Sequence, residues 1–352
     1  MSVKAGRLTI KEIASAAGVS TQTVSRVING RPDVAVETRE HVQQVIDEMG
    51  YRPSAVARSL IKGRSYTLGV VTAGLKFIGP SRTLHGITGT AEEQGYSLIL
   101  KELPSFDTNG VTPILDSLLS HRVDGIIWAV PEVGNNRDWV CEQFPGITTP
   151  MVFLAMEPRE DTFVVSIDNY AGGRMAVRHL LEQGYRHIGH VAGPLDWWEA
   201  KQRARAWKDV LQEAGLEAGD RCLAEGNWSS ASGAQAIEKL VAQYPEMDAV
   251  FAGNDQMALG VIEVVGSRGY RIPADLGIVG FDNIAESAYF SPPLTTIQQD
   301  QYAIGKVAVE QTIEIIRSRA QGSEPLKPRS IMLSPELVVR ESSLREKEVD
   351  RG

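Results

Sequence analysis

The chain has 352 residues, of which 43% are hydrophobic and 23% charged, with a formal net charge of −8. This length exceeds a single compact core and fits a small module followed by a two-lobed body. No window approaches the roughly 20 apolar residues of a membrane span, and no signal-peptide pattern is present. Cys141 and Cys222 lack a CxxC spacing, so neither a disulfide framework nor a zinc ribbon is indicated. We therefore expect a cytoplasmic protein without membrane contact, metal or cofactor.

The charge is unevenly distributed along the chain. Residues 1–62 contain nine Lys and Arg against six Asp and Glu, a net charge of +3 that leaves −11 for the remainder. A weakly basic head on an acidic body is typical of a local DNA-binding module.

Three helices are expected within the first fifty residues. The segment Thr9-Ile10-Lys11-Glu12 predicts a capping box that opens the first helix. The segment Gly18-Val19-Ser20 then ends this helix in a turn, with Ser20 as the cap of the next helix. The second and third helices are expected over residues 21–29 and 36–49. A helix, a glycine turn, a second helix and a supporting helix form the helix-turn-helix arrangement.

The outward positions of the second helix are polar. Gln22 and Arg26 are four residues apart and therefore share a face. Glutamine can bond adenine bidentately and arginine can bond guanine, so this face suits the major groove of DNA. A solvated amphipathic helix of any small domain is the alternative.

A short helix is expected after the headpiece, over residues 53–60. It spans only about two turns and would be marginal alone, so we expect it to fold when it docks against a dimer mate and DNA. Leu60 at its end can wedge between base steps of a minor groove. An ordinary linker is the alternative.

Most of this segment resembles the headpiece of the LacI/GalR repressor family. Residues 9–14, 17–20, 23–30, 38–39, 50–53 and 57–60 carry the resemblance. It implies that Thr21, Gln22 and Arg26 read bases, that Tyr51 and the capping hydroxyls contact phosphates, and that Ala57 and Leu60 enter the central minor groove. Two departures, Ala35 in place of a serine and Ser54 in place of an asparagine, weaken individual contacts. The expected DNA-binding residues are Ser20, Thr21, Gln22, Ser25, Arg26, Asn29, Thr38, Tyr51, Ser54, Ala57 and Leu60.

From Tyr66 onward, short apolar runs alternate with amphipathic segments, which predicts parallel sheets covered by helices on both faces. In such sheets, ligands bind beyond the carboxyl ends of the strands. Strands are expected over 67–71, 96–100, 125–128, 151–154, 164–167, 187–191, 249–251 and 277–279, and helices over 170–183, 200–214, 231–243 and 256–268.

Enzyme signatures are missing from this α/β pattern. No GxGxxG follows a strand, and neither GxSxG nor HExxH occurs. Residues 74–79 have Walker-like glycine spacing, but Pro80-Ser81 follows them, so the required lysine is missing. Alternation along a strand points His187 and His190 to opposite faces, so we expect both to be structural. The sequence predicts no enzyme and no metal site.

Polar residues instead gather at the predicted strand ends, near several tryptophans. They are Asp168, Asn169, Arg203, Asn254, Asp255, Asp282, Asn283, Gln299 and Asp300. Flat aromatics beside carboxylates, amides and an arginine suit a polyhydroxylated ring. Trp197 and Trp228 are favoured as ligand contacts, whereas Trp207 is at least as well explained by core packing.

The body is also similar to the effector domain of the same family, which resembles periplasmic sugar-binding proteins. Residues 192–194, 226–229, 252–260, 280–282 and 293–297 carry this similarity. Relative to the lactose repressor of the family, Ala129, Ala155 and Glu199 replace an asparagine, an acid and a serine, so we expect a related but different sugar. The expected ligand-binding residues are Ala73, Phe77, Pro80, Trp197, Arg203, Trp228, Asn254, Asp282 and Gln299.

Together these features predict an α/β protein with a helix-turn-helix headpiece (1–52), a hinge helix and linker (53–64), a two-lobed ligand-binding and dimerisation domain (65–342) and a charged tail (343–352). We expect a homodimeric repressor that binds a pseudo-palindromic operator under the control of a sugar effector. The same scaffold with a non-sugar effector or corepressor, such as a purine, is the alternative. A free sugar-binding protein is disfavoured by the basic head.

Overall fold

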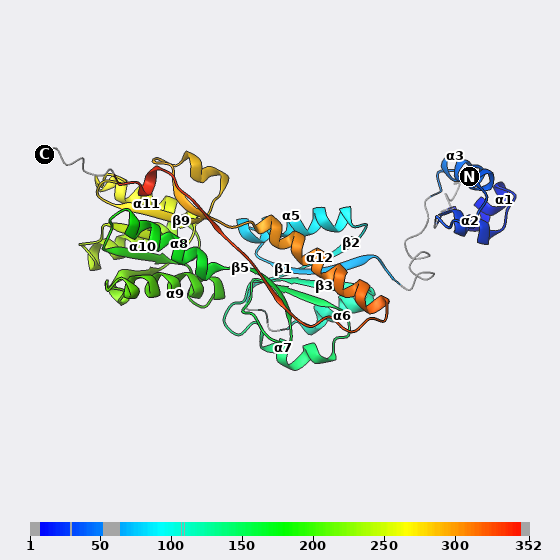
Figure 1. The fold of residues 1–352 in the computed structure, drawn as a ribbon, viewed down its shortest axis with the longest axis horizontal. Coiled ribbons are helices and arrows are strands. Elements are labelled where there is room, and N and C mark those ends of the chain that lie inside the picture. The colour runs from blue at the N-terminus through cyan, green and yellow to red at the C-terminus, as the bar shows by residue number, and fades with distance from the viewer. Residues whose placement is uncertain (1–7, 29, 52–63, 107, 109, 346–352) are drawn as a thin grey trace, which may run out of the picture. The chain divides into compact units, whose positions relative to one another are not determined.

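The computed structural model describes residues 8–28, 30–51, 64–106, 108 and 110–345, and the chain divides into two compact units, Met1–Tyr66 and Thr67–Gly352 (Figure 1). The hinge helix expected over residues 53–60 lies outside the described residues, as do Asn29, Ser54, Ala57 and Leu60. Within the described ranges, no helix is long and apolar enough to cross a membrane.

The first unit contains the three expected helices, α1 (Ile10–Ala16), α2 (Thr21–Ile28) and α3 (Val36–Glu48). The backbone N–H and the hydroxyl of Thr9 both donate to Glu12 Oε2, at 2.7 and 2.9 Å, which forms the predicted cap of α1. Gly18 adopts a φ of +64°, and Ser20 Oγ accepts from the Thr23 N–H at 3.0 Å. Local capping chemistry therefore fixes the turn that separates α1 from α2.

The second unit has two lobes, each built on a six-stranded sheet. The strand order of the first lobe is β11 (Ser330–Leu333), β5 (Phe163–Ile167), β4 (Met151–Leu154), β3 (Gly125–Ala129), β1 (Thr67–Ala73) and β2 (Ser97–Leu103). All neighbouring pairs in this sheet are parallel. Helices α5 (Ile78–Glu93) and α12 (Gln301–Ala320) pack against each other on one face, and α6 (Thr112–Ser120) and α7 (Asp138–Gln143) lie on the other (Figure 1).

The second lobe repeats this architecture. Its strand order is β12 (Glu336–Val338), β10 (Thr295–Gln298), β9 (Gly277–Asp282), β8 (Ala249–Ala252), β6 (Ile188–Ala192) and β7 (Leu223–Glu225). Only the β10–β12 pair is antiparallel. Helix α8 (Asn169–Glu182) packs with α9 (Trp198–Glu213), and α10 (Ser230–Gln243) packs with α11 (Asp255–Ser267).

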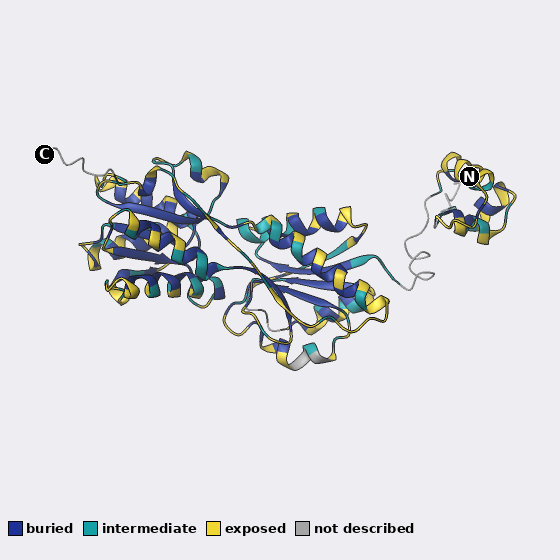
Figure 2. Cartoon of the chain, in the orientation of Figure 1, coloured by how far each residue is buried: buried dark blue, intermediate teal, exposed yellow. Residues whose placement is uncertain are grey.

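The central strands of both sheets are buried, as parallel sheets with helical cover require, whereas the edge strands β2, β7, β11 and β12 are partly exposed (Figure 2). Each of the eight expected strands overlaps an observed one, whereas β7, β10, β11 and β12 were not expected. The chain passes between the lobes three times, after β5, after β10 and between β11 and β12. These crossings bring the carboxyl ends of both sheets to the same region of the unit.

The end of the body differs from the expected boundary. Ser343 was assigned to the charged tail, yet it is fully buried, and its hydroxyl donates to Thr295 Oγ1 at 2.7 Å. The same hydroxyl lies 2.7 Å from His179 Nε2 on α8. The folded body therefore includes Ser343, because its hydroxyl is part of a buried hydrogen-bond network.

Candidate functional site

The outward face of α2 carries the side chains predicted to read bases. Thr21, Gln22 and Arg26 are exposed and Ser25 is partly buried. The opposite face of the helix is anchored by Val24 and Val27, which are buried against the core of the headpiece. Arg26 Nε lies 3.6 Å from Asp33 Oδ2, an exposed ion pair that holds the guanidinium only weakly.

The other predicted headpiece contacts have different surroundings. Ser20 is exposed and caps α2, Thr38 is partly buried in the first turns of α3, and Tyr51 packs partly buried against the headpiece core. Their roles toward DNA remain predictions, as do those of the four expected residues outside the described ranges.

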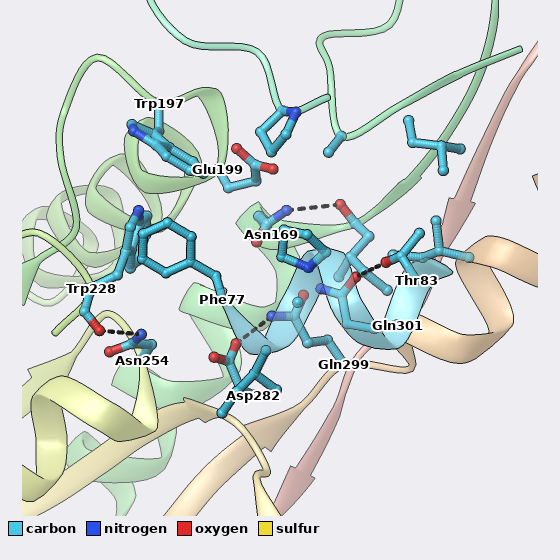
Figure 3. A pocket seen from close by; sticks show the side chains of 18 of the residues that line it. Phe77, Thr83, Asn169, Trp197, Glu199, Trp228, Asn254, Asp282, Gln299 and Gln301 are labelled. Carbon is cyan, nitrogen blue, oxygen red and sulfur yellow. Dashed lines mark hydrogen bonds between the residues drawn. The ribbon is translucent and has the colours of Figure 1, made fainter. Parts of the chain in front are cut away.

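The second unit contains a pocket between its two lobes, at the carboxyl ends of the strands (Figure 3). It encloses about 900 Å³ of empty space, part of which is open to solvent. Ala73 is not among the lining residues, because it is fully buried in the core of the first lobe. Eight of the nine expected ligand-binding residues do line it: Phe77, Pro80, Trp197, Arg203, Trp228, Asn254, Asp282 and Gln299.

Several polar lining residues were not included among the expected contacts: Thr83, Ser166, Asn169, Glu199, Gln256 and Gln301. Asn169 and Glu199 stood out in the sequence, the first by its place after a strand and the second as a departure from the family pattern. Thr83 and Gln301 gave no such signal. The Thr83 hydroxyl donates to Gln301 Oε1 at 2.8 Å across 218 positions of sequence, a contact that no local pattern encodes.

Arg203 is the cation of the pocket and is only 5% exposed. Its Nε donates to Asn169 Oδ1 at 2.9 Å and its Nη1 to the Gly253 carbonyl at 2.5 Å. The guanidinium carbon lies 3.7 Å from the ring centre of Phe281 and 5.5 Å from that of Trp228. These contacts fix the plane of the guanidinium, as a binding site requires of its charged group.

Two carboxylates stand one behind the other in the second lobe. Asp282 lines the pocket and accepts a hydrogen bond from Gln299 Nε2. Behind it, the fully buried Asp255 accepts from the Ile284 N–H at 2.9 Å and from the Thr296 hydroxyl at 2.5 Å. Burial, reinforced by the Asp282 charge, raises the pKa of Asp255 to about 8. Burial also raises the pKa of Asp282, and Arg203 opposes this effect.

Aromatic rings form one wall of the pocket. The ring centres of Trp197 and Trp228 are 5.7 Å apart in an edge-on arrangement, and Phe106 continues the cluster at 4.6 Å from Trp197. Trp207, in contrast, is buried in the core, where its Nε1–H donates to the Ile188 carbonyl. Trp197 and Trp228 therefore offer flat apolar surfaces to a bound ring.

Three residues with strained backbone conformations also line the pocket. Ala155, Trp228 and Asp282 all line the pocket and adopt φ values of +51°, +71° and +117°. Non-glycine residues rarely occupy this region, and such conformations cluster at ligand sites where the surrounding fold enforces them.

The histidines form no second site. His190 is fully buried, with Nδ1 2.8 Å from the Phe251 carbonyl oxygen, and burial lowers its pKa to about 4. His187 is exposed at the entry to β6. No group of three or more His, Cys, Asp or Glu side chains suited to a metal ion occurs among the residues that the structure describes.

A helix-turn-helix headpiece joined to a two-lobed body with an interlobe pocket is the architecture of a DNA-binding transcription regulator. Comparisons with known proteins agree, because residues 9–54 match the model for bacterial regulatory proteins of the lacI family and residues 177–343 match the periplasmic binding protein-like domain. The chain is 35% identical over 335 residues to the HTH-type transcriptional repressor PurR of Pasteurella multocida, covering 95% of this chain and 98% of that protein. It belongs to the LacI family and is a DNA-binding transcriptional repressor.

Solved structures show the same likeness. The lac repressor dimer bound to operator and the anti-inducer ONPF is 30% identical, with a TM-score of 0.84, covering 96% of this chain and 99% of that one. The complex of the regulator CelR with cellobiose is 29% identical, with a TM-score of 0.70, covering 96% of this chain and all of that one. These relatives are repressors and regulators, which confirms the prediction of a DNA-binding regulator rather than an enzyme.

Proposed function

We propose that this repressor binds a pseudo-palindromic operator as a homodimer and that a small molecule in the interlobe pocket controls its affinity for DNA. The observation that supports this is the pocket itself. Arg203 of α9, Asp282 at the end of β9 and Trp228 in the loop before α10 converge on it from the second lobe, while α5 and β3–β5 of the first lobe close the other side. A ligand that contacts both lobes favours one arrangement of them, and differential binding to two arrangements is what control of DNA affinity requires.

Two effector classes suit this pocket. A sugar, the first expectation from the sequence, fits aromatic faces flanked by carboxylates and amides. A purine, the alternative, fits the same flat surfaces and can use the same amides for its ring edge. Similarity favours the alternative: curated relatives at 33–35% identity are repressors named PurR, whereas the cellobiose complex is 29% identical. We therefore place a purine ahead of a sugar.

The effector class is tested by a thermal-shift screen of purine bases against mono- and disaccharides. A ligand present at 100 times its dissociation constant stabilises the folded protein by about 2.7 kcal/mol. We expect the larger shift from a purine. Stabilisation by sugars alone would instead support a sugar effector.

DNA recognition by α2 is tested by Arg26→Ala. The exposed guanidinium makes only a weak ion pair, so its loss should leave the headpiece folded while removing a base contact worth about 1–3 kcal/mol per half-site. We expect specificity to relax at one base pair, measured by fluorescence anisotropy with operator variants at matched salt. Arg39→Ala on α3 is the control for lost positive charge. Unchanged affinity and specificity of Arg26→Ala would remove Arg26 from the interface.

A further inference from the structure

One carboxylate oxygen of the pocket has no hydrogen-bond partner among the described residues. Glu199 occupies the first turn of α9 and lines the pocket. Its Oε2 is sealed from solvent, and no described residue donates a hydrogen bond to it. An uncompensated carboxylate oxygen in such a place is costly, so the site favours whatever supplies a donor.

The groups around Glu199 do not supply this donor. Arg203, one turn further along α9, directs Nε and Nη1 to Asn169 and the Gly253 carbonyl. Arg137 of the opposite lobe is buried over the Trp128 ring; its Nη2 donates to the Val130 carbonyl, and its Nε and Nη1 donate to no described residue. No described ion pair joins either arginine to Glu199, and Glu132, the remaining charged neighbour, is paired with Arg159 at 3.0 Å.

Backbone contacts attach the segment just before Glu199 to the first lobe. The Trp198 N–H donates to the Glu132 carbonyl at 3.0 Å, and the Gly134 N–H donates to the Asp196 carbonyl at 3.0 Å. Val133 and Trp197 form the antiparallel bridge between these bonds. The start of α9 is therefore attached to the first lobe, and the Glu199 carboxylate lies at the pocket wall (Figure 3).

The charges of the lining residues bear on the kind of ligand. Glu199, Asp282 and Arg203 are the charged side chains among the described residues that line the pocket. With both carboxylates ionised the lining carries a net negative charge, because Arg203 is the one cation among its described residues. An anionic ligand would meet like charge in a partly desolvated space, whereas a hydrogen-bond donor would meet a free acceptor.

We propose that Glu199 makes the pocket specific for an uncharged or cationic effector that donates a hydrogen bond, and that it excludes phosphorylated ligands. This rests on the proposed function, because it concerns the same pocket. The donor is an N–H of a purine base in one case and a hydroxyl or amine of a sugar in the other. Glu199 acts by direct contact with the ligand.

The contact makes binding pH-dependent. Burial raises the pKa of Glu199 to about 7, against the opposing effects of Arg203 and Arg137. A donor ligand binds the ionised form, so protonation competes with it. We expect affinity to rise about tenfold from pH 6 to pH 8 and to level off above that, since each pH unit below the pKa removes the ionised form about tenfold.

The test is isothermal titration calorimetry on the full-length chain at pH 6 and pH 8. One arm uses adenine, guanine and AMP, and the other uses cellobiose, glucosamine and glucose 6-phosphate. We expect the unphosphorylated compounds of one arm to bind and the phosphorylated compound to bind at least tenfold more weakly. In Glu199→Gln, a substitution of nearly equal shape, the affinity at pH 8 should fall about tenfold and the pH dependence should vanish.

Asp196→Asn is the matched control, because it removes an exposed carboxylate three residues away and should bind as the parent does at both pH values. Thermal unfolding of each variant separates loss of binding from loss of folding. A pH-independent affinity that Glu199→Gln leaves unchanged would overturn the inference while leaving the effector pocket intact. Preference for AMP or glucose 6-phosphate would overturn it as well. Binding of no compound from either arm would reject this ligand class, whereas operator binding by the same preparation tests the repressor function separately.

Discussion

Alanine in place of Arg203 is expected to abolish the response of the protein to its effector while leaving operator binding in place. The guanidinium is the cation of the pocket, and the Asn169 amide, the Gly253 carbonyl and the Phe281 ring hold it in one orientation. Each hydrogen bond to a charged group contributes about 1.5–3 kcal/mol, so the loss of two such bonds to a ligand reduces its affinity at least a hundredfold. The headpiece lies in a separate compact unit and retains its own core.

The measurement is the increment in melting temperature that a saturating effector produces, since Arg203→Ala also removes buried contacts and lowers the unliganded melting temperature. Arg205→Ala is the control. Arg205 lies two residues further along α9, is largely exposed and pairs at 3.6 Å with Asp209, so the variant should keep the full increment. If Arg203→Ala responded to the effector as Arg205→Ala does, the ligand would not bind where the structure has the pocket.

The headpiece was the part of the fold most accessible from sequence. Its helix boundaries depend on capping groups three residues apart, such as Thr9 with Glu12 and Ser20 with Thr23, and on the turn at Gly18. Interactions of this range appear in the sequence as short patterns. The three helices were therefore predicted to within a residue at most boundaries.

Strands β7, β11 and β12 were not predicted, because long-range pairing determines them. β7 and β12 have three residues each, too few for alternation to be recognised, and β11 joins the first lobe only after the chain has returned through α12. Their pairing partners are β6, β10 and β5, all of which lie more than thirty positions away in the sequence. Tertiary pairing rather than local propensity determines these strands.

The pocket was predictable where a residue lies at the carboxyl end of a strand, as Asn254 and Asp282 do, because the carboxyl ends of parallel strands meet at one edge. The prediction that Ala73 contacts the ligand was wrong for a related reason. It is the last residue of β1, and its methyl group packs in the core of the first lobe, while the chain reaches the pocket four residues later at Phe77. The sequence located the correct loop but not the residue at which it turns into the site.

Alanine at Gly260 is expected to destabilise the second lobe by about 3 kcal/mol or more. Gly260 lies on α11 where that helix meets α10, and a β-carbon there would overlap the Ser230 carbonyl and lie 2.7 Å from Ala234 N. Both atoms belong to the backbone of α10, so neither can move aside as a side-chain tip would. The helices must separate, and the apolar contacts between them are lost. Chemical denaturation monitored by tryptophan fluorescence measures the change in the free energy of unfolding.

Alanine at Gly266, on the same helix, is expected to have the opposite effect on stability. It is exposed, and a β-carbon there would have no neighbour within 4 Å. Alanine at this position should stabilise the helix by about 0.5–1 kcal/mol, because it restricts the unfolded chain without any steric cost in the folded one. Two identical substitutions six residues apart are thus expected to change the free energy of unfolding in opposite directions. Equal effects at Gly260 and Gly266 would mean that helix propensity, rather than the close approach of α10 and α11, determines the outcome at both positions.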